Sequence, residues 1–569
     1  MMRRLPDARF AVMLGNSRLY RAWKKINRKR RLYAQFPAPG LPGEEEAPEA
    51  LLLQQMSDAN GTAVGVAADL RGAEDAARAT VFCLRNQTHR AWELCAAVAS
   101  DAQERCVLRA ANGDGRVRCV HVAPDAPVGE ALGAALAALN EPLLAVLAPR
   151  TVLHPCALWY AVREDAPLVF TDGVENGRLL CKPEYAPDTL RSRNDLDGWL
   201  VFRRELCRDG DFSEGMYGLA LRLTERASRV ARIPHALYRM EKTQDETAER
   251  RALAAHLARC GLRGTPRPLG GGLWRVEYEL ASRPLVSIII PNRDQAQVLR
   301  RCVTSVTQRS SYDKYEIVVL ENGSVQAETF RLYDELCAKG VRIETYRADG
   351  SFNYARINNW GARRARGDVL LFLNNDIEVI TPGWLEEMLM FAQRPDVGAV
   401  GSLLWYPDDT VQHAGVAAGA AGAASHIHKF AKRGEMGWLG CLRCVRNVSA
   451  VTGACLMVRR EVFEAAGGFD DAAFAVAFND IDLCLRLCGE ELHNVFTPFA
   501  QLYHHESVSR GSDETPENAA RFTAEVERFR TRWHAYFDSC DPCYSPRLNR
   551  ADERVFIVDS KSESGFFCR

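Results

Sequence analysis

The sequence has neither a net charge nor a long apolar run. Its 569 residues include 73 Lys+Arg and 73 Asp+Glu, so the formal net charge at pH 7 is zero with histidine neutral. Nucleic-acid-binding proteins normally carry a basic surface, so we expect no nucleic-acid partner. A run of about 18 apolar residues is missing, as is the apolar stretch of a signal peptide. We therefore expect a cytoplasmic protein without a membrane-spanning helix.

Apolar residues nevertheless make up 47% of the chain, which is enough for a sizeable core. The length favours roughly two to four domains. The 18 cysteines are scattered through apolar stretches, and without an export signal we expect them to be reduced. Two C-x-x-C pairs, Cys441/Cys444 and Cys540/Cys543, leave a Cys₄ zinc site as a minor alternative.

The N-terminal segment is strongly basic, with eleven Lys/Arg between Arg3 and Arg31. Leu19, Trp23 and Ile26 recur at helical spacing among them, which favours either a membrane-surface helix or a helix docked on the protein itself. Pro- and Glu-rich residues follow and indicate a linker. The predicted divisions are a basic segment with linker (1–50), a first α/β domain (51–245), a helical and Gly/Pro linker (246–283), a second domain (284–511) and a helical extension (512–569).

Strand and helix patterns alternate from Leu285 onward, which predicts a mostly parallel sheet with right-handed crossovers. The buried strand pattern of Val369–Leu373 stops at Asn374, Asn375 and Asp376. Earlier strand patterns likewise end in polar or turn residues. Open α/β sheets bind ligands beyond the carboxyl ends of their strands, and a carboxylate there is suited to holding a divalent cation. An ordinary Asn/Asp turn is the alternative.

Six short motifs between residues 285 and 511 resemble those of family 2 glycosyltransferases, in the family's order. They are Leu285–Pro291, Glu321–Ser324, Leu373–Asp376, Val451–Ala454, Phe478–Leu483 and Tyr503–Ser507. The nearest resemblance is to bacterial rhamnosyl- and other sugar transferases of surface-polysaccharide assembly. The resemblance implies two tandem GT-A-type domains, of Rossmann-like α/β class with mostly parallel sheets.

The resemblance also implies roles for individual residues. Asp376 and His504 are the implied ligands of Mn²⁺ or Mg²⁺, with His505 as a rival to His504. Imidazole favours manganese. The implied substrate contacts, with the nucleotide, the donor sugar or the acceptor, are Pro291, Glu321, Asn322, Asn374, Asn375, Gly453 and Ala454.

Asp480 is the candidate general base, just before a helical pattern. An aspartate there also makes a good helix cap, but Asp482 in the first turn fits the cap better and leaves Asp480 for chemistry. A base opposite the leaving group implies direct displacement with inversion at the sugar carbon.

The first half of the chain repeats the second in part, because Tyr217–Leu223 parallels Ile481–Leu487. In this alignment Arg150 stands where Asp376 stands, Met216 where Asp480 stands and Arg239 where His504 stands. The first copy therefore lacks the groups that would perform chemistry. A chance similarity between Ala/Leu-rich segments is the alternative.

We therefore expect an inverting, metal-dependent glycosyltransferase. It would move a rhamnose- or hexose-type sugar from a UDP- or dTDP-sugar to a growing surface polysaccharide or lipid-linked glycan. The basic N-terminus suggests peripheral contact with the anionic inner face of the plasma membrane. The alternative is a catalytically inactive scaffold that binds nucleotides or sugars. A dinucleotide oxidoreductase is disfavoured because no G-x-G-x-x-G follows the first strand.

Overall fold

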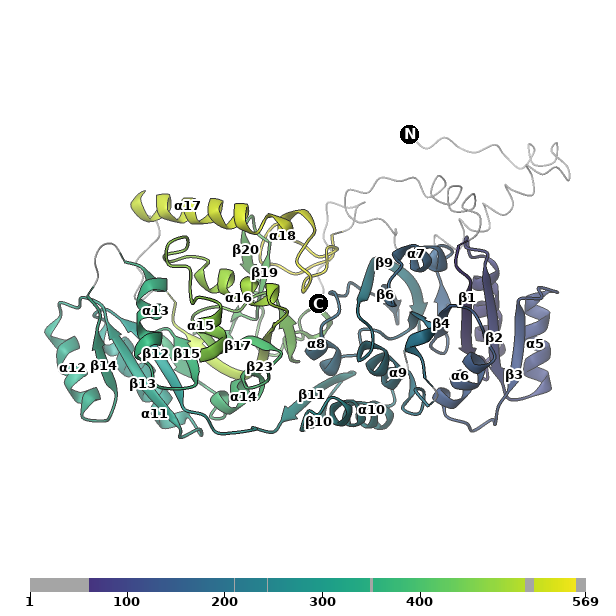
Figure 1. Cartoon of the computed structure of the whole chain (residues 1–569), viewed down its shortest axis with the longest axis horizontal. Coiled ribbons are helices and arrows are strands. Elements are labelled where there is room, and N and C mark those ends of the chain that lie inside the picture. Colours follow the sequence, from purple (N-terminus) through teal and green to yellow (C-terminus); the bar gives the residue numbers. More distant parts are fainter. Residues whose placement is uncertain (1–60, 209, 243, 348–351, 507–515, 559–569) are drawn as a thin grey trace. The chain divides into compact units, whose positions relative to one another are not determined.

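The computed structural model describes residues 61–208, 210–242, 244–347, 352–506 and 516–558 (Figure 1). The basic N-terminal segment lies outside these ranges. The chain divides into two compact units. The first holds Met1–Tyr185 and Asn194–Cys260, and the second holds Ala186–Arg193 and Gly261–Ile557.

The first unit is built on a mixed sheet in the order β3-β2-β1-β4-β8-β6-β9-β5, with β7 beside β6. Its strands are β1 (Val64–Asp69), β2 (Trp92–Val98), β3 (Val117–His121), β4 (Leu143–Leu147), β5 (Val152–Leu153), β6 (Leu168–Glu175), β7 (Arg178–Leu180), β8 (Trp199–Arg203) and β9 (Val230–Met240). Its helices are α4 (Glu74–Arg85), α5 (Asp101–Ala111), α6 (Val128–Ala137), α7 (Ala157–Glu164), η1 (Arg204–Leu206), α9 (Gly215–Thr224) and α10 (Glu246–Arg259).

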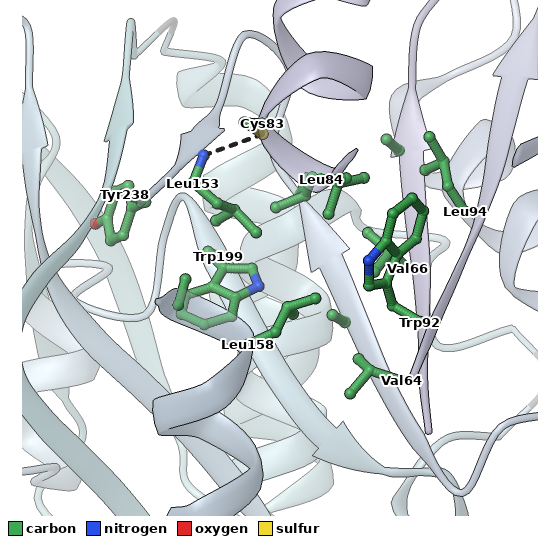
Figure 2. Close-up of a cluster of buried hydrophobic side chains, with 14 of the residues drawn as sticks. Val64, Val66, Cys83, Leu84, Trp92, Leu94, Leu153, Leu158, Trp199 and Tyr238 are labelled. Atoms are coloured by element: carbon green, nitrogen blue, oxygen red, sulfur yellow. Dashed lines mark hydrogen bonds between the residues drawn. The ribbon is translucent and has the colours of Figure 1, made fainter. Parts of the chain in front are cut away.

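The core of the first unit forms between this sheet and helices such as α4 and α7 (Figure 2). Val64 and Val66 of β1, Trp92 of β2 and Trp199 of β8 are almost completely buried there. Burying side chains of this size contributes roughly 1.5–3 kcal/mol each. The first unit therefore has a hydrophobic core of its own.

The second unit contains a sheet in the order β14-β13-β12-β15-β22-β17-β23-β16, with β18 beside β17 and β21 beside β23. Its strands are β12 (Val286–Asn292), β13 (Tyr315–Glu321), β14 (Arg342–Thr345), β15 (Val369–Leu373), β16 (Ile377–Val379), β17 (Val397–Trp405), β18 (Val411–His413), β21 (Arg446–Val448), β22 (Cys455–Arg459) and β23 (His493–His504). Two hairpins lie outside it, β10 (Gly264–Gly270) with β11 (Leu273–Tyr278), and β19 (Val416–Ala418) with β20 (Ala424–His426).

The helices of the second unit follow the expected strand–helix alternation. They are α8 (Pro187–Ser192), α11 (Ala296–Arg309), α12 (Ala327–Cys337), α13 (Tyr354–Arg364), α14 (Trp384–Ala392), η2 (Trp438–Gly440), α15 (Arg460–Ala465), α16 (Asn479–Gly489), α17 (Pro516–Arg532) and α18 (His534–Asp538). Within the described ranges, none of the chain's helices combines the length and apolar character needed to cross a bilayer.

The two sheets have the same topology. Each pair of neighbouring strands in the first sheet has the same relative direction, parallel or antiparallel, as the corresponding pair in the second sheet. Arg239 pairs with Val152 as His504 pairs with Ile377. Met216 is the second residue of α9, as Asp480 is of α16. The predicted α/β class is confirmed. Residues that the sequence alignment matched, such as Arg239 with His504 and Met216 with Asp480, occupy equivalent positions in the two folds.

The predicted linker 246–283 is regular structure in both of its halves. The helical half is α10, which belongs to the first unit. The Gly/Pro half forms the β10–β11 hairpin of the second unit, and Gly270, Gly271 and Gly272 adopt positive φ at its turn. Glycine supplies that conformation without steric cost, so the glycines mark a hairpin turn here.

Candidate active site

The turn after β15 presents its polar residues at the carboxyl edge of the second sheet. All five residues of β15 are buried, which fixes where the turn begins. Asp376 is only 5% exposed, and its Oδ1 lies 3.2 Å from Nε2 of His504. The two residues meet because β16, directly after the turn, pairs antiparallel with the end of β23.

His504 and His505 point to different carboxylates. His504 faces Asp376, whereas Nε2 of His505 lies 3.2 Å from Oε2 of Glu378. The backbone N–H of His505 donates to the carbonyl oxygen of Asp376 (3.0 Å). His504 is the last residue of β23 and lies opposite Ile377, whereas His505 follows the strand and turns its side chain to Glu378. Geometry therefore favours His504 over His505 as a partner of Asp376.

Asp376 and His504 fit a divalent cation in their chemistry. Oδ1 of Asp376 is buried and accepts no hydrogen bond from a described group, and Nδ1 of His504 is likewise without a described partner. Burial raises the pKa of Asp376, but the contact with His504, a backbone hydrogen bond and the nearby His505 together hold the pKa below its ordinary value. The carboxylate is thus held ionised next to an imidazole, a combination that suits Mn²⁺ or Mg²⁺.

The two asparagines of the turn have different neighbours. Nδ2 of Asn375 donates to Oδ1 of Asn292 at the end of β12 (2.7 Å), and this amide pair is buried. Asn375 therefore ties the turn to the neighbouring strand, whereas the family resemblance implied a substrate contact. Asn374 instead accepts from the hydroxyl of Tyr354 (3.1 Å), and its Nδ2 lies 3.3 Å from Nε2 of His504.

The ends of β12 and β13 form the predicted nucleotide side. Pro291 and Asn322 are partly exposed there. Glu321 is different, because its buried carboxylate accepts from the hydroxyls of Ser324 (2.6 Å) and Tyr333 (2.5 Å). Glu321 therefore shapes the turn after β13, and its carboxylate is already engaged within the protein.

Asp480 lies half-buried in the first turn of α16 and faces the Gly453–Ala454 loop. Its Oδ2 accepts from the backbone N–H of Gly453 (2.7 Å), and its Oδ1 accepts from that of Ile481 (2.9 Å). The expectation that Asp482 caps the helix is wrong. Asp482 is completely buried and accepts from Arg486 and Arg532 at 2.9 and 2.8 Å. It anchors α16 to other elements.

Tyr354 at the start of α13 joins the two halves of the site. Its hydroxyl lies 3.1 Å from both Oδ1 of Asn374 and the carbonyl oxygen of Gly453. A path of direct contacts therefore runs from Asp376 through His504, Asn374, Tyr354 and Gly453 to Asp480. Sequence reasoning missed Tyr354 because a tyrosine that begins a helix carries no signal of its own.

The matching turn of the first unit has none of this chemistry. Arg150 there adopts a left-handed conformation (φ 59°), and its Nη1 lies 3.1 Å from an oxygen of Glu241. Ala148 donates its N–H to the carbonyl oxygen of Gly198, as Asn374 donates to that of Ala454. The two turns thus make the same backbone hydrogen bond, whereas Arg150 stands in the first unit where the second has Asp376.

Comparison with known proteins identifies a family in the second unit. Residues 287–467 match the model of glycosyl transferase family 2. The matched range includes Asp376 and Gly453 but ends before Asp480 and His504.

Three curated relatives extend this result. The chain is 36% identical over 513 residues to the uncharacterized protein y4gI of Sinorhizobium fredii, covering 84% of this chain and 56% of the relative. It is 35% identical over 507 residues to the O-antigen biosynthesis protein RfbC of Myxococcus xanthus, covering 83% and 39%. It is 32% identical over 161 residues to an N-acetylglucosaminyl-diphospho-decaprenol L-rhamnosyltransferase of Mycobacterium tuberculosis, covering 27% and 52%.

The chain thus spans about half the length, or less, of the curated relatives it matches. Among solved structures, GalNAc-T7 with UDP, GalNAc and Mn²⁺ matches at 16% identity and a TM-score of 0.37, covering 48% of this chain and 53% of that one.

Proposed function

Because residues 287–467 form a glycosyl transferase family 2 domain, we propose that the second unit is an inverting sugar transferase. It takes a rhamnose- or hexose-type sugar from a UDP- or dTDP-sugar and passes it to a growing surface polysaccharide or lipid-linked glycan. The polysaccharide class is supported by the similarity to an O-antigen biosynthesis protein and a rhamnosyltransferase.

One observation carries the proposal, namely the contact path that joins Asp376 to Asp480. It connects a carboxylate–imidazole pair suited to a diphosphate-bound cation with a carboxylate suited to accepting a proton. A transferase needs both groups at one site, one for the leaving group and one for the attacking hydroxyl.

Asp480 is the proposed general base. The N–H groups of Gly453 and Ile481 orient its carboxylate, which is proposed to accept the proton of the acceptor hydroxyl. Gly453 and Ala454 are the proposed acceptor-side loop. The hydroxyl attacks the sugar carbon from the face opposite the diphosphate, so the configuration inverts.

Asp376 and His504 are the proposed metal ligands. A bound Mn²⁺ or Mg²⁺ would neutralise the charge on the departing diphosphate. Pro291 and Asn322 are the proposed contacts with the pyrimidine, since their partly exposed side chains lie at the ends of β12 and β13. Asn374 lies between the two functional centres and is proposed to contact the donor.

The first unit is proposed to be a non-catalytic scaffold or acceptor-binding domain. Arg150, Met216 and Arg239 stand at the positions of Asp376, Asp480 and His504, and none of them suits Mn²⁺ or Mg²⁺ as a ligand or can accept a proton at neutral pH. For the whole chain, the alternative is a scaffold that binds nucleotides or sugars without catalysis.

Location is proposed to be the cytoplasmic side of the plasma membrane. The eleven basic residues between Arg3 and Arg31, which lie outside the described ranges, would contribute about 1 kcal/mol each near an anionic surface. The lipid-linked acceptor proposed above would be reached at that surface.

A panel of UDP- and dTDP-sugars tests the function. The full chain is incubated with each donor and Mn²⁺, and release of the free nucleotide is measured. We expect slow hydrolysis of at least one donor without acceptor, and its loss in Asp376→Asn. A protein that binds these nucleotides but cleaves no donor, with or without added cell-envelope glycan, would favour the scaffold alternative.

A further inference from the structure

Helix α17 lies beyond the matched family region (Figure 1). It contacts the loop that leads into Asp480 through hydrogen bonds to Val476 and Ala477. Its Glu525 is 0% exposed. Oε1 of this carboxylate accepts from the N–H of Val476 (3.0 Å), and Oε2 accepts from the N–H of Ala477 (3.1 Å). Among the described residues, Arg521 is the cation in ion-pair range of Glu525, with its Nε 3.8 Å from Oε2. The two backbone bonds are therefore the principal short contacts of a carboxylate removed from water.

The two amides stand directly before a strained residue. Phe478 adopts a left-handed conformation (φ 64°), and α16 begins at the next residue. A bulky side chain rarely adopts such a backbone conformation, which persists only where the surroundings hold it. The ring of Phe478 stacks on Phe529 (4.9 Å between centroids) and Phe522 (5.8 Å), both from α17.

The same helix holds α16 at a second point. Arg532 donates from Nη1 to Oδ1 of the buried Asp482 (2.8 Å), and Nε1 of Trp533, directly after α17, donates to the same oxygen (3.1 Å). Asp480 lies between the two points of contact, with Val476 and Ala477 before it and Asp482 after it. Helix α17 thus restrains the backbone on both sides of Asp480.

We infer that Glu525 is a positioning residue for Asp480. By fixing the backbone at Val476 and Ala477, it sets the start of α16 and so aims the Asp480 carboxylate at the N–H of Gly453. The inference rests on the proposed function, because it assigns Glu525 a part in catalysis through the proposed base. It makes α17 part of the catalytic unit although the helix lies outside the matched family region.

The test compares Glu525→Gln with Glu527→Gln in the full chain. Glutamine preserves the shape but offers one acceptor oxygen and turns an NH₂ group toward a backbone N–H. Glu527 lies on the same helix and is exposed, so its variant is the matched control. We expect kcat to fall about 10²-fold in Glu525→Gln, since misplacing a catalytic group by about 1 Å has this effect. UDP affinity and the KM of the donor should be unchanged, because the proposed nucleotide contacts lie on β12 and β13.

Hydrogen exchange supplies a readout that does not depend on activity. In Glu525→Gln we expect faster exchange both in the peptide containing Val476 and Ala477 and in the peptide containing Gly453, whose N–H is bonded to Asp480. Protection of Gly453 that equals that of the wild type would overturn the inference, as would a folded variant with full kcat. A wild-type protein that cleaves no donor would defeat the proposed function, and exchange at Gly453 would still decide whether Glu525 positions Asp480. Should Glu525→Gln not fold, Glu525→Asp, which keeps both acceptor oxygens on a shorter side chain, replaces it in both measurements.

Discussion

Replacing Asp480 with asparagine separates its chemical role from its structural role. The variant retains the size of the side chain but has no carboxylate to accept a proton. Removing a general base slows turnover by roughly 10²–10⁴-fold, which corresponds to about 3–5 kcal/mol of transition-state stabilisation. We therefore expect Asp480→Asn to lose nearly all transfer while binding UDP as the wild type does.

The structure also indicates how far the free energy of unfolding should fall in Asp480→Asn. Asparagine can still accept from one of the two N–H groups that Asp480 serves, Gly453 or Ile481. The loss of one hydrogen bond to a charged group would lower the free energy of unfolding by about 1.5–3 kcal/mol. A modest fall in Tm is therefore expected beside a large fall in turnover.

The assay measures initial rates of nucleotide release at saturating donor, UDP affinity by titration calorimetry, and Tm. Glu490→Gln at the exposed C-terminal end of α16 is the control and should change none of the three. Full turnover in Asp480→Asn would refute the reasoning. A variant that fails to fold would instead show that the aspartate serves mainly to hold the Gly453 loop against α16.

Three further predictions concern the metal, the first unit and the membrane. UDP or dTDP should bind more tightly with Mn²⁺ or Mg²⁺ than with EDTA, and Asp376→Asn should abolish the difference; equal affinity in EDTA would contradict a metal-assisted site. Arg150→Ala and Met216→Ala should leave turnover at saturating donor and acceptor within about twofold, because the first unit lacks a metal carboxylate and a base; a large loss in a folded variant would show that it takes part in the chemical step. The full chain should co-sediment with anionic liposomes more strongly, and with greater salt sensitivity, than a chain starting at Glu44; equal binding by both would place the membrane contact outside the basic segment.

The strands and the polar residues that end them could be predicted from the sequence. The buried run Val369–Leu373 and the polar turn after it led directly to Asp376, because a strand and its terminating residues are encoded by neighbours in the chain. The repeat was readable for the same reason, and strand register places Arg239 where it places His504.

The contacts that individual polar side chains make could not be predicted in the same way. Glu321 and Asn375 sit at strand ends, as a ligand contact would, yet their side chains are engaged with Ser324, Tyr333 and Asn292. Asp482 resembles a cap and is instead an anchor for Arg532. Tyr333, Asn292 and Arg532 lie outside the short motifs of the residues that they contact. A local sequence pattern therefore cannot show which partner each side chain reaches.

Fold class, family and the order of the motifs could be predicted from the sequence, because they depend on periodicity and on short runs of residues. The tertiary structure is what brings the polar groups into contact. It placed His504 rather than His505 against Asp376, because antiparallel pairing of β16 with β23 sets His504 opposite Ile377, the residue after Asp376. It also placed Tyr354 between Asn374 and Gly453. Glu525 of α17 likewise contacts the backbone just before Asp480. Contacts between residues so far apart in the chain depend on the packing of whole elements, which no local pattern specifies.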